Sequence, residues 1–317
     1  MFTHEKIQYI KGEYILGDPE KASCNIQRPQ AAFVLENTQN VCIHFHNLFE
    51  YLNAFYLVCK YINLPIQIFY NIKQRTFCVP QFQKYANYYE LPITIYSESE
   101  NIKIESENIF VLRRFFNVSD ITKEFLLFLR KNIINSNSFS HTKKILINRN
   151  PKRIWGMPCY RRLTKENIDF FISKGYEYHE IQDYSIEEQA TLFNSATHIV
   201  ASHGSALANI VYCNSGTKII EINSAYNPTC YPRIAKILYQ QIGIYLNYYF
   251  LIDDEYYNYM ETIDTAEVFN PYTYQDIVLK DENDCYRKIL NPIEFQKKEH
   301  ADISEFGVDV QKLCKIV

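Results

Sequence analysis

One stretch of the chain, residues 199–222, contains an apolar strand, a short polar turn, a helix and a second apolar strand in immediate succession. The first strand runs into the turn His203-Gly204-Ser205, after which small and apolar residues follow as in a buried helix. The second strand carries one acid, Glu221, close to its end. A strand, a helix and a strand in so few residues predict a βαβ unit with two parallel strands.

The turn between these two strands has the features of a phosphate site. Gly204 would let the backbone approach a ligand, and the first N–H groups of the following helix have no partner within the helix, so the turn attracts phosphate. Glu221 would lie at the carboxyl end of the next strand, where an acid accepts hydrogen bonds from a ribose in nucleotide-binding sheets. The alternative is an ordinary βαβ corner with a structural histidine, because the turn holds one glycine and no Gly-x-Gly-x-x-Gly pattern.

Strands and helices alternate throughout the second half of the chain. Thr164 is a predicted N-cap, Gly175 closes the helix that it begins, and Ser185 and Glu188 form a capping box. We expect strands at 144–148, 176–181, 198–201, 218–222 and 245–251, and helices at 164–173, 185–195, 205–213 and 228–242. This alternation predicts a parallel sheet with helices on both faces.

The first half of the chain has a similar but less regular pattern. We expect strands at 31–35, 41–45, 66–70, 93–96 and 109–112, and helices at 48–62 and at 125–133, the latter capped by Asp120. The polar stretch 135–141 predicts a linker. The sequence thus divides into an α/β domain at 1–140, a second α/β domain at 141–260 and a tail at 261–317. One possibility is that this tail packs back on the first domain.

The composition is that of a soluble globular protein, with 47% hydrophobic and 22% charged residues. A formal net charge of -3 gives no reason to expect nucleic acid or an anionic membrane as a partner. Nine cysteines, an odd number without a Cys-x-x-Cys pair, indicate reduced thiols. Because no apolar run resembles a signal peptide or spans a bilayer, we expect a cytoplasmic protein without a transmembrane segment. The sequence leaves the oligomeric state open.

Cations are predicted at strand ends of the second domain, where α/β sheets bind their ligands. Arg149 follows an apolar strand directly, and Arg162 lies in the sequence after it. A guanidinium and a helix N-terminus together make a pyrophosphate clamp. A solvated loop is the alternative for Arg162, whereas the position of Arg149 favours a ligand contact.

A second polar cluster lies at a predicted strand-to-helix junction in the first domain. His46 and Glu50 are four residues apart and would share one helical face, as a general base and the residue that orients it. A metal pair of His44 and His46 is an alternative, but no further cluster has ligand spacing, so no metal is expected. A helix start with polar residues facing solvent is the other alternative.

These positions together resemble glycosyltransferase family 61. The resemblance rests on Arg149, on Ser185-x-x-Glu-Gln189, on His203-Gly-Ser-Ala-Leu-Ala-Asn209 and on Gly216-Thr-x-x-x-Glu221. The family motif reads approximately His-Gly-Ala-Gly-Leu-Thr-Asn, from which Ser205, Ala206 and Ala208 depart. An N-terminal His-x-x-x-Asp of the family has the spacing of His46 and Glu50, with Glu in place of Asp. The resemblance covers roughly residues 41–250.

The resemblance implies a GT-B architecture, in which two Rossmann-like domains with parallel sheets face a cleft. It implies an inverting transfer from a nucleotide sugar, which we expect to be UDP-linked, to a hydroxyl acceptor in glycan or polysaccharide synthesis, without an essential metal or other cofactor. The missing leader points to a bacterial-type or viral glycan pathway. Glu50, helped by His46, would deprotonate the acceptor, and the donor contacts would be Arg149, Arg162, Ser185, His203, Gly204, Ser205, Ala206, Asn209 and Glu221.

Two other functions remain open at the level of the sequence. A polysaccharide pyruvyltransferase on a similar frame would use phosphoenolpyruvate as its donor. A catalytically silent module would bind a nucleotide or a glycan without turnover. The presence of Glu221 favours the glycosyltransferase, because an acid at that strand end has a role when a ribose is bound.

Overall fold

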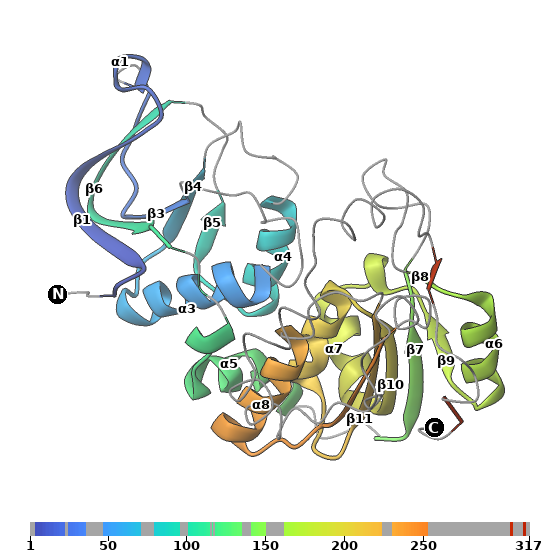
Figure 1. Cartoon of the computed structure of the whole chain (residues 1–317). Coiled ribbons are helices and arrows are strands. Elements are labelled where there is room, and N and C mark those ends of the chain that lie inside the picture. Colours follow the sequence, from blue (N-terminus) through green and yellow to red (C-terminus); the bar gives the residue numbers. More distant parts are fainter. Residues whose placement is uncertain are drawn as a thin grey trace, which may run out of the picture. The chain divides into compact units, whose positions relative to one another are not determined.

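The computed structural model describes residues 4–22, 25–35, 47–70, 79–95, 101–114, 116, 118–134, 141–149, 162–223, 230–252, 305–306 and 313–314. The chain divides into two compact units, Met1–Leu129 and Arg130–Val317. Each unit has its own sheet, and each is described by itself (Figure 1).

The first unit contains a mixed six-stranded sheet with the order β1-β6-β3-β4-β5 and with β2 paired to β6. Neighbours among β6, β3, β4 and β5 are parallel, whereas β1 lies antiparallel to β6. The strands are β1 Ile7–Leu16, β2 Ile26–Gln27, β3 Ala31–Leu35, β4 Ile66–Tyr70, β5 Ile93–Ile95 and β6 Ile102–Leu112. The helical segments are α1 Pro19–Ala22, η1 Asn47–Tyr51, α3 Leu52–Tyr61, α4 Val79–Tyr88, η3 Val118–Asp120 and the first part of α5 Lys123–Ile134, whose residues from Arg130 on belong to the second unit.

The core of the first unit is built around β3, whose five residues are all buried. Phe33 packs against Phe55 of α3, with ring centroids 5.0 Å apart. Val34 belongs to a second cluster that contains Val111 of β6. A strand covered on both faces requires such a continuous apolar run, which explains why β3 was predicted correctly.

The edge strand β1 was not predicted from the sequence. Its burial alternates between exposed and intermediate positions, and its register with β6 shifts between Ile10 and Gly12. Such a half-exposed strand with a bulge gives a weak apolar pattern. The first sheet therefore has the expected parallel strands β6, β3, β4 and β5, and β1 adds an antiparallel edge.

Two expected features near the helices of the first unit were also corrected. The expected helix 48–62 begins with a π-helical turn, η1, before α3. Asp120 does not cap α5, because Thr122 Oγ1 accepts the hydrogen bond from the backbone N–H of Phe125. Asp120 lies instead in η3, where its carboxylate pairs with Lys6 at 2.5 Å. The expected strand 41–45 and most of the linker 135–141 fall outside the described residues.

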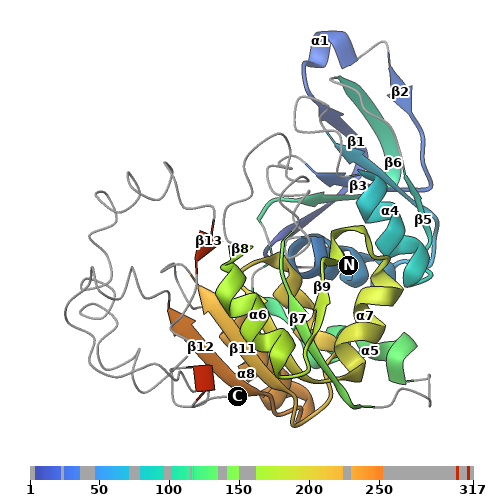
Figure 2. The same cartoon turned by 90° about the vertical axis from the view of Figure 1, so that its right-hand side faces the viewer.

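The second unit contains a five-stranded sheet with the order β12-β11-β10-β7-β9, in which every pairing is parallel (Figure 2). Its strands are β7 Lys143–Ile147, β9 Glu177–His179, β10 Ala196–Ser202, β11 Lys218–Asn223 and β12 Asn247–Ile252. Its helical segments are α6 Lys165–Ser173, η4 Ile181–Asp183, α7 Ile186–Ser195, η5 Ser205–Tyr212 and α8 Cys230–Ile242. Figure 1 shows α6 on one side of this sheet and α7 and α8 on the other. The predicted parallel sheet with helices on both faces is confirmed for this unit.

The helix caps of the second unit and the end of its helix α6 were predicted correctly. Thr164 caps α6 by accepting from the backbone N–H of Asn167, and Gly175 ends this segment with a φ of 82°. Ser185 and Glu188 form the expected reciprocal capping box at the start of α7. Both units are mixed α/β with parallel strand pairing, which is consistent with a Rossmann-like α/β class.

The described residues of the tail lie in the second unit. Glu305–Phe306, strand β13, pairs in parallel with Arg162–Leu163, strand β8. Leu313 is fully buried in a cluster with Leu146 of β7. These described residues therefore belong to the second unit. Within the described part of the chain, no helix has the length and the apolar character needed to cross a bilayer.

Candidate functional site

The carboxyl edge of the second sheet brings together residues from three neighbouring strands. Ile147 of β7 pairs with Ala201 of β10, and Ala201 pairs with Glu221 of β11, so these three side chains share one face. Arg149 follows Ile147 by two residues and His203 follows Ala201 by two, which places both on the same face. The structure thus assembles three of the predicted site residues from positions that are far apart in the sequence.

The guanidinium of Arg149 lies directly over Gly204. A Cβ atom at position 204 would be 2.9 Å from Arg149 Cζ and closer still to Nη2. Arg149 Nη2 also donates a hydrogen bond to the carbonyl oxygen of His203 at 3.2 Å. The backbone of Gly204 is extended, with φ 162° and ψ 174°, a conformation open to any residue. A Cβ at this position would therefore push the arginine aside, whereas the backbone of residue 204 would accept any residue.

We predict that Gly204→Ala displaces this guanidinium. The free energy of unfolding should fall by about 1 kcal/mol, the low end of the range for overpacking, because the clashing atoms are the far end of a side chain that can move aside. In an Arg149→Ala background the same change should cost little stability, since the clash no longer exists. Chemical denaturation of the four proteins measures this difference. Equal losses in both backgrounds would contradict the assigned contact.

His203 and Glu221 form a buried pair below this arginine. His203 Nδ1 lies 2.5 Å from Glu221 Oε1, and Glu221 is 0% exposed. The other carboxylate oxygen, Oε2, accepts a hydrogen bond from the hydroxyl of Tyr248 in β12. Tyr231 of α8 packs edge-on against the His203 ring, with centroids 5.4 Å apart. Both oxygens of Glu221 are engaged inside the protein, so this arrangement does not support the expected contact with a ribose.

The helix after the turn is a 3₁₀ helix, η5, which follows Gly204 without a side-chain cap. The amide of His203 is not available to a ligand, because it donates to the carbonyl oxygen of Ile222 at 2.8 Å. The donors of the first turn are therefore expected from Gly204, Ser205 and Ala206, since a 3₁₀ helix leaves its first N–H groups outside its own bonds. The turn therefore offers a ligand three backbone amides, and the amide of His203 is not among them.

Asn209 supports the turn from within the protein. It is 0% exposed, and its Nδ2 donates to Gln189 Oε1 of α7 at 2.9 Å and to the carbonyl oxygen of Ala206 at 3.1 Å, so it ties α7 to the first turn of η5. Ser185 is exposed, and its hydroxyl accepts from the backbone N–H of Glu188 as the N-cap of α7. A donor contact of either residue stays a prediction.

The far end of η5 is fixed by a buried arginine that the sequence reading did not single out. Arg130 is 6% exposed, and its Nη1 donates to the carbonyl oxygens of Val211 at 2.6 Å and of Cys213 at 2.8 Å. Asn194 donates to the carbonyl oxygen of Tyr212 at 2.9 Å. Both ends of η5 are thus held by hydrogen bonds from side chains of other elements.

Arg162 is placed beside Arg149 by a backbone contact. Its Nε donates to the carbonyl oxygen of Arg149 at 2.9 Å. The neighbouring Leu163 donates its N–H to Asn148 Oδ1 at 3.1 Å, so β8 lies against the carboxyl end of β7. The structure brings the second predicted cation to the same edge as the first.

The predicted acid–base pair belongs to the first unit. Glu50 lies in the π-helical turn η1 and is 9% exposed. π-helical turns are rare and often occur at functional sites. His46 falls outside the described residues, so the expected partnership of His46 with Glu50 stays a prediction.

In the described part of the chain, no group of three or more His, Cys, Asp or Glu residues is placed to hold a metal ion. Cys59, Cys213 and Cys314 are not in disulfides. Burial raises the pKa of the thiols of Cys59 and Cys213 to about 12, which makes both poor nucleophiles.

Tyr248 and Tyr231 are the site residues that the sequence reading missed. A tyrosine within an apolar strand gives no functional signal in itself. Ile219 pairs with Tyr248, so the tyrosine lies on the Glu221 face of the sheet, but this register is known only from the folded sheet.

Comparison with known families adds an independent finding. The family model described as Glycosyltransferase 61 matches residues 44–220, which extend from the residues before η1 to β11. No curated protein matches the chain.

Proposed function

The chain belongs to glycosyltransferase family 61, and we propose that it transfers a sugar from a UDP-linked nucleotide sugar to a hydroxyl acceptor in glycan or polysaccharide synthesis. We infer the donor site from the guanidinium of Arg149, which is held over Gly204 at the carboxyl edge of a parallel sheet. Ligands of α/β sheets bind at this edge. The family match favours a glycosyltransferase over a pyruvyltransferase.

On the donor side, we propose that the diphosphate lies against Arg149 and the first turn of η5. A guanidinium and backbone N–H groups stabilise the negative charge that develops on the leaving diphosphate. Arg162, bonded to the backbone of Arg149, adds a second cation at the same edge. These groups would replace a divalent cation, so the proposed reaction needs no metal.

On the acceptor side, we propose that Glu50, oriented by His46, is the general base. The acceptor hydroxyl passes its proton to Glu50, and its oxygen forms a bond to the anomeric carbon. The bond from that carbon to the β-phosphate oxygen breaks, and the electron pair leaves with the nucleoside diphosphate. In-line attack of this kind inverts the anomeric centre. We propose a GT-B arrangement, because it would let the base of one domain reach the donor of the other.

We predict that UDP and UDP-sugars raise the melting temperature of the protein in a thermal-shift screen that also includes GDP-, CMP- and dTDP-sugars and phosphoenolpyruvate. A ligand that binds the native state and not the unfolded state raises the melting temperature. Stabilisation by phosphoenolpyruvate without any nucleotide effect would point to a pyruvyltransferase. UDP binding without turnover on any acceptor would point to a silent module.

We also predict that EDTA leaves the transfer rate unchanged, because protein cations and amides balance the diphosphate charge. The rate is measured before and after chelation, with added Mn²⁺ as the comparison. A strict requirement for Mn²⁺ would overturn the metal-independent part of the proposal, and the transferase assignment would remain.

A further inference from the structure

Tyr248 lies beyond the residues 44–220 that the family model matches, yet it contacts the candidate site. It is 2% exposed, and its hydroxyl donates a hydrogen bond to Glu221 Oε2. Glu221 is bonded through Oε1 to Nδ1 of His203. A continuous hydrogen-bonded chain therefore runs from β12 through β11 to the turn of His203 and Gly204, over which Arg149 lies.

This chain satisfies the needs of a buried carboxylate. A fully buried carboxylate is costly unless hydrogen bonds reach both of its oxygens. His203 serves one oxygen of Glu221 and Tyr248 serves the other. Removing the Tyr248 hydroxyl would leave Oε2 without this donor, and the carboxylate would then lose one of the two hydrogen bonds that fix its orientation.

The same chain determines which ring nitrogen of His203 a ligand can meet. With Nδ1 hydrogen-bonded to Glu221, the remaining nitrogen is Nε2 on the opposite side of the ring. Tyr231 packs edge-on against this ring and Arg149 Nη2 bonds the backbone oxygen of His203, so the histidine is held from several elements. The orientation of Nε2 thus depends on Glu221, and the orientation of Glu221 depends on Tyr248.

We propose that Tyr248 is a positioning residue for donor binding, acting through Glu221 to hold His203 as a ligand of the nucleoside diphosphate. In the bound state Nδ1–H donates to Glu221, Nε2–H donates to a phosphate oxygen, and the carboxylate balances the charge of the imidazolium. This inference rests on the proposed function, because the diphosphate is the group that Nε2 meets. It goes beyond that function by assigning a residue of β12 to the donor site.

A double-mutant cycle with UDP as the probe tests whether Tyr248 acts through His203. Calorimetric titration gives the Kd for the wild type, Tyr248→Phe, His203→Gln and the double variant. Tyr248→Phe should raise the Kd about tenfold, as expected for the loss of a hydrogen bond to a charged group. In the His203→Gln background the same change should have no further effect on the Kd, because the histidine ring through which Tyr248 acts is absent.

Tyr249→Phe is the matched control. Tyr249 is the next residue of β12, and it packs on the opposite face of the sheet, in the cluster of Leu146 and Phe171. The Tyr249→Phe variant loses a hydroxyl, as Tyr248→Phe does, and keeps its ring beside Lys218. Its Kd for UDP should equal that of the wild type.

The outcomes separate this inference from the proposed function. If Tyr248→Phe weakens binding equally in both backgrounds, its role is general packing and the inference is overturned. If the wild type binds UDP and Tyr248→Phe binds as well, the inference alone fails. If the wild type binds no nucleoside diphosphate, the proposed function fails and takes the inference with it.

A measurement on the wild type covers the case in which Tyr248→Phe does not fold. Nitrogen-15 NMR of labelled histidine, with His203 assigned by comparison with His203→Gln, shows which ring nitrogen carries a proton. The inference expects a protonated Nδ1. An unprotonated Nδ1 would mean that Glu221 is the donor of that bond, and this would overturn the proposed arrangement.

Discussion

Replacing Arg149 by alanine is expected to weaken UDP binding by roughly 10- to 150-fold, the equivalent of about 1.5–3 kcal/mol for a hydrogen bond to a charged group. The guanidinium is already held in place over Gly204 and on the carbonyl oxygen of His203, so little order has to be gained when the diphosphate binds. Calorimetric titration with UDP measures the change. Arg149→Lys should recover only part of the loss, because an ammonium lacks the planar pair of donors.

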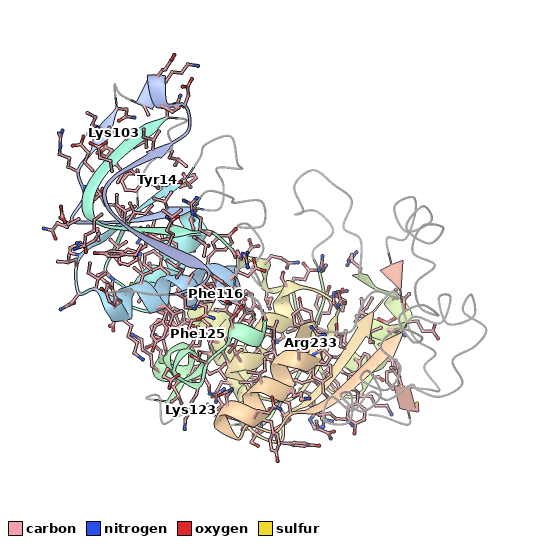
Figure 3. The ribbon with its side chains drawn as sticks, turned by 60° about the vertical axis from the view of Figure 1, so that its left-hand side comes forward. Tyr14, Lys103, Phe116, Lys123, Phe125 and Arg233 are labelled. Carbon is pink, nitrogen blue, oxygen red and sulfur yellow. The ribbon has the colours of Figure 1, made fainter. Side chains whose placement is uncertain are left out.

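Arg233→Ala is the matched control for this experiment. Arg233 is an exposed arginine of α8, labelled in Figure 3, and it follows Tyr231 by two residues, so it projects from a different side of the helix. The Arg233→Ala variant removes the same charge from the same unit. Its affinity for UDP should stay within about twofold of the wild-type value, since exposed charges are screened by salt. If Arg149→Ala bound UDP as tightly as this control, Arg149 would not be part of the donor site.

Much of the second unit could be predicted from the sequence because its signals are local. Parallel strands covered on both faces appear as short apolar runs, and β10 and β11 were found in this way. Thr164 and Ser185 cap their helices with bonds to residues three positions away, so the sequence contains both partners. Asp120 was predicted as the cap of α5, whereas Thr122 takes that role in the structure, because both residue types suit it and only the folded helix distinguishes them.

The contacts within the candidate site could not be predicted, because they depend on the register between strands. The sequence identified Arg149, Gly204 and Glu221 as unusual for their positions. It could not show that Gly204 makes room for a side chain of the protein, because that contact joins residues 55 positions apart across two strands. Nor could it show that Glu221 faces Tyr248, which depends on how β12 pairs with β11. The residue types were therefore informative, whereas their partners had to come from the fold.

Glu50→Gln is expected to lower the rate of transfer by roughly 10²- to 10⁴-fold while leaving the Kd for UDP unchanged. An amide of the same size cannot accept the proton of the acceptor hydroxyl, so the loss should appear in kcat. The substitution keeps the shape of a side chain that is 9% exposed at the start of α3, and near-native stability is therefore expected. Initial rates with a UDP-sugar, together with calorimetric titration of UDP, separate the two effects.

Glu107→Gln provides the comparison for this variant. Glu107 is an exposed residue of β6 in the same unit, and the same loss of charge there should leave both the rate and the affinity unchanged. Three results of the Glu50 variant can be distinguished. Retained activity would place the base elsewhere in the chain. Lost UDP affinity would make Glu50 part of the donor site. Lost activity with retained affinity would support proton removal from the acceptor by a residue of the π-helical turn, and a parallel loss in His46→Ala would then identify the residue that orients it.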